Sequence, residues 1–304
     1  FFEFCDENMQ CELTVTINDD EDTLTTTEIL ILEISDQNDL PMLVEIIGNT
    51  IENVDLVFIA LHGGDGENGK IQKFLEEKNI NFTGSNSAAS SIAMNKDESK
   101  KICIENNIPT PKWIIVNKES INKKINFNGK VVVKPINEGS SVGMSIINNC
   151  YIKEEISIEF KKALDLCFTI SSEAMIEEYI PGRELTVSVL DNKTLPIIEI
   201  MPKGVFYDYK SKYTKGESDY LIPAQLDVRT KSLLNEYSMK IHKIIGCSGY
   251  SRVDFRLSDD NKIYFLEINT LPGFTDTSLF PKAANAVGLG YNKLVKDIIR
   301  LALK

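Results

Sequence analysis

Strand-like and helix-like stretches alternate along the first half of the chain. From residue 55, the apolar run DLVFIAL breaks into the glycine-rich HGGDGENG, and the helix-like GKIQKFLEEKN follows. A Thr/Ser/Asn segment then leads into a second helix-like stretch and the strand-like IPTPKWIIV. Short apolar runs bounded by turn residues predict strands, and their alternation with helices predicts an α/β region with parallel pairing.

Two further units follow. From about residue 95, strands are predicted at GKVVVKP, MSIIN and EAMIEEYI, with a helix at IKEEISIEFKKALDLC. From about residue 179, the pattern predicts two hairpins, ELTVSVLDNKTLPIIEI and RVDFRLSDDNKIYFLEIN, a helix near 229–245 and a terminal amphipathic helix, YNKLVKDIIRLALK. We therefore expect a mixed fold, α/β and α+β, in three parts that span residues 1–94, 95–178 and 179–304.

The hairpin RVDFRLSDDNKIYFLEIN carries polar side chains at alternating positions. If residues 259–262 form a four-residue loop, Asp254 lies opposite Glu267 and Arg252 lies opposite Asn269, all on one face. Facing carboxylates repel unless a cation lies between them, and with an amide oxygen they form an oxygen-only ligand set suited to Mg²⁺.

The alternative for this hairpin is a surface location without chemistry. One face would then be polar and the other apolar, as in many antiparallel pairs. The expected apolar face consists of Val253, Phe255, Tyr264, Leu266 and Ile268.

Composition excludes several classes of protein. The chain has 304 residues, of which 42% are hydrophobic, enough for two or three domains with a large core. It contains neither a run of roughly 20 uncharged apolar residues nor a basic segment followed by an apolar one. Six scattered cysteines without CxxC spacing favour reduced thiols, and two histidines exclude a His-rich metal site. We expect a cytoplasmic protein without a membrane partner.

Charge is distributed unevenly. The net charge of −12 argues against a nucleic-acid partner. Residues 1–69 contain seventeen Asp or Glu and no Lys or Arg, so the other residues carry all 33 basic side chains and 28 of the 45 acidic ones. This mildly basic body suits a polyanion such as ATP.

The segment VVVKPINEGSSVGMS could hold a phosphate. Lys134 ends a strand and precedes a loop with Ser140 and Ser141, where a lysine beside accessible backbone amides can grip an anion. It is not a Walker A motif, because the lysine precedes the loop. An ordinary Gly/Ser turn is the alternative.

The segment AMIEEYIPGREL could hold a nucleoside. Strand-edge backbone beside Ile180 could read an adenine, while an acidic side chain such as Glu184 could hold ribose hydroxyls. A domain linker is the alternative, and the two interpretations are compatible.

Two later segments add candidates. The polar FYDYKSKYTKGESDY is a basic, aromatic loop that could close over a phosphate and exclude water, or a solvated loop without function. In NTLPGFTDTSLFPKAA, Gly273 permits close backbone approach, and Ser278 begins a helix-like stretch that could bind a carboxylate.

Taken in order, seven stretches closely resemble the D-alanine–D-alanine ligases of the ATP-grasp superfamily: LHGGDGENG, MNKDESK, VVVKPINEGSSVG, MIEEYIPGRELTV, FYDYKSKYT, GYSRVDF and FLEINTLPGFTDTSLFP. The resemblance covers about residues 54–304. It implies an ATP-grasp fold with an N-terminal α/β substrate domain (1–94), a central lid domain (95–178) and a C-terminal Mg²⁺-binding domain (179–304). ATP would lie between the last two.

The resemblance also implies ligand-binding residues. Those matching the ATP site are Lys96, Lys134, Ser141, Glu177, Tyr179, Ile180, Glu184, Tyr207 and Lys212. Those matching the ligands of two Mg²⁺ ions, which Mn²⁺ could replace, are Asp254, Glu267 and Asn269.

Catalytic and substrate-binding residues follow from the same resemblance. Those matching catalytic groups are Arg252, Ser140, Tyr213, Gly273 and Lys212, of which Arg252 and the Gly273 amide would stabilise the transition state. His62 matches the first-substrate site, and Ser278 and Leu279 match the groups that hold the carboxylate of the second D-alanine.

The implied reaction joins two D-alanines at the expense of ATP. The carboxylate of the first attacks the γ-phosphorus, and the amine of the second attacks the resulting acyl phosphate. Tyr213 stands where ligases that make D-alanyl-D-lactate resemble one another in carrying a different residue, typically histidine, which favours the dipeptide. The family resemblance further implies a homodimer in peptidoglycan precursor synthesis.

The N-terminal segment departs from the family pattern. Family members begin with a strand and a loop of the type GGxSxExEVSL, whose Glu binds the first D-alanine, and residues 1–61 contain a single glycine, Gly48. The segment is divergent, is incomplete or altered, or has lost the first-substrate site. Glu7 or Glu12 could substitute for the missing glutamate.

Two other functions therefore stay open. One is another ATP-grasp ligase with altered amino-acid or hydroxy-acid selectivity. The other is a nucleotide-binding pseudoenzyme whose acidic N-terminal face binds a partner. The full set of Mg²⁺- and phosphate-type residues argues against the pseudoenzyme, and the N-terminal departure argues for it.

Overall fold

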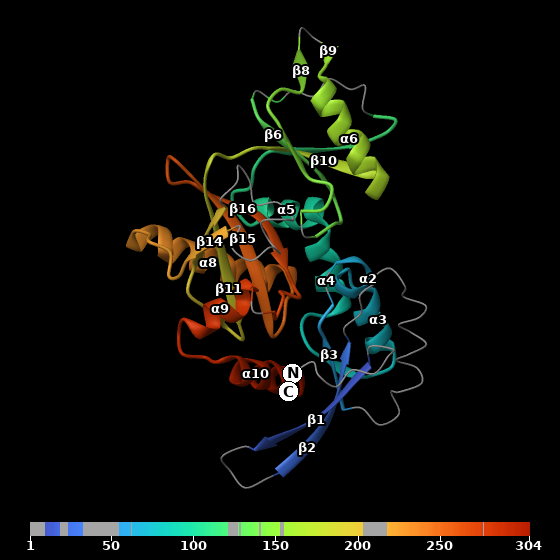
Figure 1. The fold of residues 1–304 in the computed structure, drawn as a ribbon, viewed down its shortest axis with the longest axis vertical. Coiled ribbons are helices and arrows are strands. Elements are labelled where there is room, and N and C mark those ends of the chain that lie inside the picture. Colours follow the sequence, from blue (N-terminus) through green and yellow to red (C-terminus); the bar gives the residue numbers. More distant parts are fainter. Residues whose placement is uncertain are drawn as a thin grey trace.

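Three main β-sheets and one two-stranded sheet, with flanking helices, make up the described part of the chain (Figure 1). The computed structural model describes residues 10–18, 24–32, 55–61, 63–120, 127, 129–139, 141–152, 155–202, 218–275 and 277–304, with the backbone alone at 10–18, 24–32, 151–152 and 155. In Figure 1 the sheet that carries α6 lies at the top, the sheet of β11, β15 and β16 in the middle and the strands β1–β3 at the bottom.

The first sheet has the strand order β1-β2-β3-β4. Its elements are β1 (Gln10–Asn18), β2 (Leu24–Leu32), β3 (Leu56–Ile59), α2 (Gly64–Glu67), α3 (Lys70–Glu77) and β4 (Asn81–Phe82). β3 pairs in parallel with both β2 and β4, which confirms the predicted parallel pairing from residue 55 onward. β1 and β2 form an antiparallel pair that the sequence patterns did not predict.

The second sheet has the strand order β5-β10-β6-β7, and its pairs are antiparallel. Its elements are β5 (Trp113–Asn117), β6 (Val131–Pro135), β7 (Ser145–Ile147), α6 (Ile158–Ile170) and β10 (Glu173–Glu178), with β8 (Tyr151–Ile152) and β9 (Glu155–Ile156) as a small separate pair.

Alternation along β6 and β10 gives the second sheet two different faces. Val131 and Val133 pack with α6 in a buried cluster, as do Ala174 and Ile176. Successive side chains on a strand point to opposite faces. Lys134 therefore lies on the face of the sheet away from α6. The odd-numbered residues of β10, which include Glu177, lie on the same face, because Met175 is the partner of Lys134.

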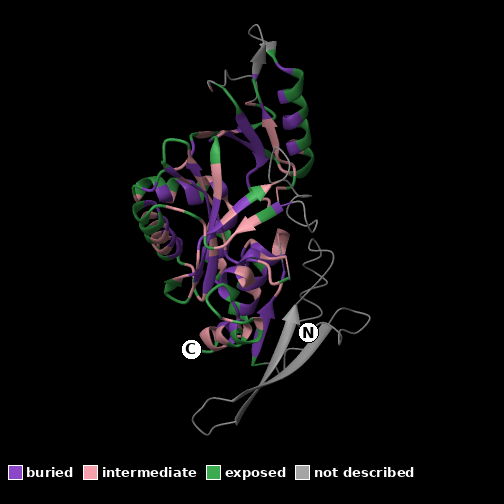
Figure 2. Cartoon of the chain, turned by 60° about the vertical axis from the view of Figure 1, so that its left-hand side comes forward, coloured by how far each residue is buried: buried purple, intermediate pink, exposed green. Residues whose placement is uncertain are grey.

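The third sheet has the strand order β14-β13-β11-β15-β16, with β12 paired to β11. Its elements are β11 (Gly182–Leu190), β12 (Lys193–Thr194), β13 (Ile198–Pro202), β14 (Ser218–Leu221), α8 (Val228–Ile245), β15 (Tyr250–Ser258) and β16 (Ile263–Asn269). Helices α4 (Ser87–Met94) and α5 (Lys96–Glu105) contribute to the core beneath it, together with α8. Figure 2 shows the buried strands inside and exposed residues on the outer helices.

The β15–β16 hairpin corrects one part of the sequence prediction. Its turn is a three-residue loop, because Ser258 N donates to Lys262 O (2.9 Å) and Asn261 adopts φ +58°. A bulge between Phe255 and Asp254 then shifts the register by one residue, to the pairing that the four-residue loop had predicted. The expected opposite pairs, Asp254 with Glu267 and Arg252 with Asn269, are confirmed.

The same loop and bulge change which residues of β16 face the core. Between the turn and the bulge, the residues of β16 that face the core are the opposite set from the predicted one, so Ile263 and Phe265 are buried. Tyr264 and Leu266, which were expected on the apolar face, lie on the other side, and Leu266 lines the cleft described below.

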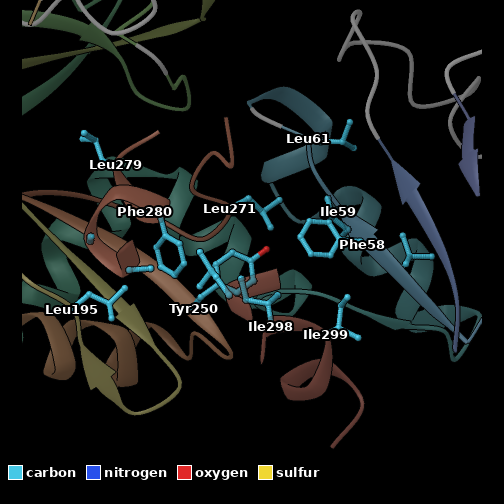
Figure 3. Packing of buried hydrophobic residues seen from close by; sticks show 14 of the residues in the cluster. Phe58, Ile59, Leu61, Leu195, Tyr250, Leu271, Leu279, Phe280, Ile298 and Ile299 are labelled. Carbon is cyan, nitrogen blue, oxygen red and sulfur yellow. The ribbon is translucent and has the colours of Figure 1, made fainter. Parts of the chain in front are cut away.

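A shared hydrophobic core joins the first sheet to the third (Figure 3). Phe58 of β3 packs edge-on against Phe274, with ring centroids 5.6 Å apart, and Phe274 contacts Tyr250 of β15 in the same way at 5.7 Å. Residues from α9 (Leu279–Asn285) and α10 (Tyr291–Ala302) complete the cluster. No helix in the part of the chain that the structure describes has the length and apolarity to span a bilayer.

Gly182, the first residue of β11, allows β11 to pair closely with β15. Its φ is +128°, and a Cβ there would lie 2.1 Å from the Leu257 carbonyl oxygen. We predict that Gly182→Ala lowers the free energy of unfolding by about 2–4 kcal/mol, because both the backbone and the contact become strained. Gly139→Ala, whose Cβ meets nothing within 4 Å, should change it by less than about 0.5 kcal/mol. Equal urea midpoints for the two variants would refute this role of Gly182.

Glu67, at the end of α2, is a buried carboxyl. It is 8% exposed, and its Oε2 accepts a hydrogen bond from Gly63 N at 2.8 Å. Burial raises the pKa of Glu67 from 4.5 to about 7, although the Gly63 amide and Arg252 both act to lower it. Between these two pH values the folded protein holds a proton that the unfolded chain has lost.

This proton makes stability depend on pH. We predict that the Glu67 contribution to the free energy of unfolding is fully present below pH 4.5 and falls as pH rises to about 7, by up to about 3 kcal/mol. Urea unfolding of the ligand-free protein from pH 5 to 8 should show this fall in the wild type relative to Glu67→Gln. His242, whose pKa burial lowers to about 4, contributes the opposite slope, which cancels in that difference. Glu105→Gln, at an exposed glutamate, is the control, and a Glu67→Gln profile parallel to the wild type contradicts the assignment.

Candidate active site

A partly open cleft, with about 780 Å³ of empty space that includes open solvent at its mouth, lies between the second sheet and the β15–β16 hairpin. It is lined by residues of both sheets and of α5. Nine of the predicted site residues line it: Lys96, Lys134, Ser141, Glu177, Tyr179, Ile180, Glu184, Asp254 and Glu267. Residues far apart in the sequence are thus brought to one cavity.

Two nearly buried lysines enter the cleft from different elements. Lys134 is the penultimate residue of β6, and its Nζ lies 2.9 Å from Glu177 Oε1. Lys96 begins α5 just after the N-cap residue, and its Nζ donates to Glu138 O at 2.5 Å and lies 3.4 Å from Glu267 Oε2. Two ammonium groups in a confined cavity attract an anion.

The loop between β6 and β7 supports the same conclusion. Ser141, which lines the cleft, has φ +61°, an uncommon conformation for a residue other than glycine. Such backbone is concentrated at ligand-binding loops, where the surrounding structure maintains it. Here it brings Ser141 to the cleft that the two lysines also line.

Glu177 is held by two ammonium groups. Besides Lys134, the Lys100 Nζ lies 2.6 Å from Glu177 Oε2. Burial alone would raise the pKa of Glu177, but the two ammonium groups outweigh it and hold the pKa below its usual value. Sequence reasoning missed Lys100. Its spacing of four residues from Lys96 on one helix was the available signal, because such residues share a face.

Arg256 contacts the residues of the cleft that were predicted to hold a nucleoside, and sequence reasoning missed it as well. Its guanidinium donates to Ile180 O (3.1 Å) and Gly182 O (2.8 Å), and its Nη1 lies 3.3 Å from Glu184 Oε2. It also lies 5.7 Å from the centroid of the Tyr179 ring. Alternation along β15 was the available signal, because Arg256 follows Asp254 by two residues on the same face.

The β15–β16 hairpin presents the predicted metal-type face. Arg252 makes a bidentate pair with Asp254, Nε to Oδ1 at 3.0 Å and Nη2 to Oδ2 at 2.9 Å. Thr186 Oγ1 also donates to Asp254 Oδ1, at 2.5 Å. The facing carboxylates are thus each beside a cation, Arg252 for Asp254 and Lys96 for Glu267.

The donor set of this face fits Mg²⁺. Asp254 and Glu267 supply carboxylate oxygens into the cleft, and the Asn269 Oδ1, which accepts from Leu271 N at 2.8 Å, retains a second lone pair. Among the described residues no group of three or more His, Cys, Asp or Glu side chains is arranged for a metal. The candidate site therefore consists of two carboxylates and an amide. The remaining coordination positions of Mg²⁺ would be filled by a ligand.

The remaining predicted residues lie beyond β16 or outside the described residues. Ser278 is the N-cap residue of α9, its Oγ accepts from Thr275 N at 3.0 Å, and Leu279 is buried beneath it. Gly273 lies in the loop between β16 and α9. The predictions for His62, Ser140, Tyr207, Lys212 and Tyr213 fall on residues outside the described part of the chain.

The candidates for the missing N-terminal glutamate are only partly placed. Glu7 lies outside the described residues, and Glu12 lies in β1, opposite Leu30 of β2, with the backbone alone described. Neither prediction is therefore tested.

Family models match most of the chain. The model described as the D-ala D-ala ligase C-terminus matches residues 102–300, and the model of the D-ala D-ala ligase N-terminus matches residues 8–85. The likeness thus extends into the N-terminal segment that departs from the family's glycine-rich motif.

Individual proteins show the same likeness. A D-alanine–D-alanine ligase of Syntrophotalea carbinolica is 42% identical over 246 residues, 81% of this chain and 78% of that protein. The structure of the Bacillus anthracis D-alanine–D-alanine ligase complexed with ATP matches with a TM-score of 0.72 and 35% identity, over 85% of this chain and 82% of that one. A D-Ala:D-Ser ligase of Enterococcus faecalis matches with a TM-score of 0.70 and 30% identity, over 82% and 73%. With the cleft, its two lysines and the acidic hairpin face, these matches show that the chain belongs to the D-alanine–D-alanine ligase family and has its ATP-grasp fold.

Proposed function

We propose that this protein is an ATP-dependent ligase that joins two D-alanines into D-alanyl-D-alanine, a precursor of peptidoglycan. One observation carries the proposal: a single cleft contains two buried lysines, an acidic hairpin face and a strand edge suited to a nucleoside. Family membership supplies the substrates, since relatives at about 40% identity are named for this reaction.

The charges of the cleft support it as the binding site for ATP. Tyr179, Ile180 and Glu184 would hold the nucleoside, with Arg256 fixing the backbone that faces it. Lys96 and Lys134 would hold the phosphates, with Ser141 on the covering loop. Tyr207 and Lys212 complete the proposed ATP site from the family resemblance.

The hairpin face would hold the divalent cation. We assign Asp254, Glu267 and Asn269 as ligands of two Mg²⁺ ions, or of Mn²⁺ in their place. Asp254 and Glu267 lie opposite each other and line the cleft, and Asn269 follows Glu267 by two residues on β16. The cation supplies neutralisation of charge on the phosphoryl oxygens.

The chemistry proceeds through an acyl phosphate. The carboxylate of the first D-alanine attacks the γ-phosphorus, and ADP leaves. The amine of the second D-alanine attacks the acyl carbon, phosphate leaves, and the amine loses a proton. Arg252 is anchored by Asp254, which lines the cleft, and its guanidinium would stabilise the oxyanion together with the Gly273 amide.

The other assigned residues complete the proposal. Ser278 and Leu279 would hold the carboxylate of the second D-alanine, and His62 would lie at the first-substrate site. Ser140, Lys212 and Tyr213 would act over the reacting phosphate, where a closed loop keeps water from the acyl phosphate.

We further propose the division into domains 1–94, 95–178 and 179–304. Each of the three main sheets falls within one of these ranges, which supports it. The family resemblance supports a cytoplasmic homodimer whose partners are small molecules, and the net charge of −12 makes nucleic acid an unsuitable partner.

A coupled assay with ATP, Mg²⁺ and D-alanine tests the function. ADP should form only when D-alanine is present, together with one dipeptide per ADP, and D-lactate should support little turnover as the second substrate. ATP binding without ADP formation would favour the pseudoenzyme. Turnover that prefers D-lactate or D-serine would assign another ligase specificity.

Asp254 provides a sharper test through substitution. We predict that Asp254→Asn lowers kcat by about 100-fold or more, because a ligand and the anchor of Arg252 are lost together. Asp259→Asn, in the exposed turn of the same hairpin, is the matched control and should change kcat less than about twofold. Similar kcat values for both variants would rule out the proposed metal face.

A further inference from the structure

Lys100 is a charged side chain enclosed by the protein. Its side chain has 0% exposure, and it does not line the cleft. Its Nζ pairs with Glu177 Oε2 at 2.6 Å, donates to Thr110 Oγ1 and lies 5.3 Å from the centroid of the Trp113 ring. A buried charge is costly unless it is paired, so an ammonium held here needs an explanation.

Glu177 connects this buried ammonium to the cleft. One carboxylate oxygen pairs with Lys100 and the other with Lys134, whose side chain is 10% exposed and lines the cleft. The three groups carry two positive charges and one negative charge. A Lys134–Glu177 pair alone would be neutral, and its attraction for a phosphate would be weak.

We propose that Lys100 is a positioning residue that balances the charge of Glu177, so that Lys134 keeps its positive charge available to the phosphates of ATP. The inference rests on the proposed function only in taking ATP as the ligand of the cleft. Lys100 does not touch the nucleotide. It acts through Glu177.

The surroundings of Lys100 suit this role. Thr110 Oγ1 accepts from Lys100 and donates to Phe265 O at 2.9 Å, so the ammonium is anchored to β16, the strand that carries Glu267. The triad thus lies between the second sheet and the metal-type hairpin. Its net positive charge faces the part of the cleft in which the phosphates are proposed to lie.

Lys100→Met tests the proposal by removing the charge and keeping the length of the side chain. With Mg²⁺ present and D-alanine absent, calorimetric titration should show ATP affinity about tenfold weaker, while adenosine affinity stays within about threefold. The effect should be confined to ligands with phosphates. Equal losses for ATP and adenosine would show that Lys100 only shapes the cleft, and would overturn the proposal.

A double-mutant cycle separates charge balance from packing. In the Glu177→Gln background no carboxylate remains to be neutralised, so adding Lys100→Met should change the ATP affinity by less than about threefold. If Lys100 only filled space, its loss would weaken ATP binding equally in both backgrounds.

A titration of the wild type avoids any variant that folds poorly. Lys100 faces Glu177 of β10 and Lys134 of β6, with Cys103 on its own helix, and burial is the largest influence that lowers the pKa of Lys100, to about 8. ATP affinity should therefore weaken about tenfold between pH 7 and 9.5, with adenosine affinity unchanged. A flat ATP profile would contradict the proposal. The ligase assay on the same preparation distinguishes failure of the Lys100 proposal from failure of the proposed function. Absence of D-alanine-dependent ADP formation in the wild type would contradict only the proposed function.

Discussion

The antiparallel pairing of β15 with β16 is the constraint on which the site depends. It sets Asp254 opposite Glu267 and Arg252 opposite Asn269, and places both carboxylates at the edge of one cleft. Facing carboxylates would repel, and Arg252 and Lys96 are the cations that offset this in the ligand-free protein. A shift of one residue in this register would turn the acidic face into the core.

Charge balance links that hairpin to the second sheet. Lys96 pairs with Glu267 and donates a hydrogen bond to Glu138 O in the loop after β6. Lys100, one helical turn later, pairs with Glu177, which also pairs with Lys134. Among the described residues, most of the charged side chains that line the cleft are therefore paired, and a polyanion with its cation could replace or join these pairs. Structural pairing involves the same side chains as the proposed ligand binding, and this pairing explains why the charged groups tolerate burial here.

Sequence reasoning predicted the ATP-grasp fold, and nine of the residues that it assigned to the site line one cleft. The alternation of side chains along strands and the order of the motifs were enough to group Asp254, Glu267 and Lys134, because each lies on a strand whose side chain enters the cleft. The three-residue turn and the bulge of the β15–β16 hairpin were not predictable, and the assumed four-residue loop gave the right pairs because the two errors cancel. The roles of Lys100 and Arg256 depend on partners distant in sequence, Glu177 and Ile180, and only packing brings these together. The core shared by β3 and α10 was unpredictable for the same reason.

The metal face is tested most directly by counting bound cations. Electron paramagnetic resonance should measure Mn²⁺ bound per chain in the presence of a non-hydrolysable ATP analogue. We expect about two bound ions in the wild type, and at least one fewer in Glu267→Gln with the analogue still bound. An equal number of ions in both proteins would contradict the assignment of the β15–β16 face as the metal site.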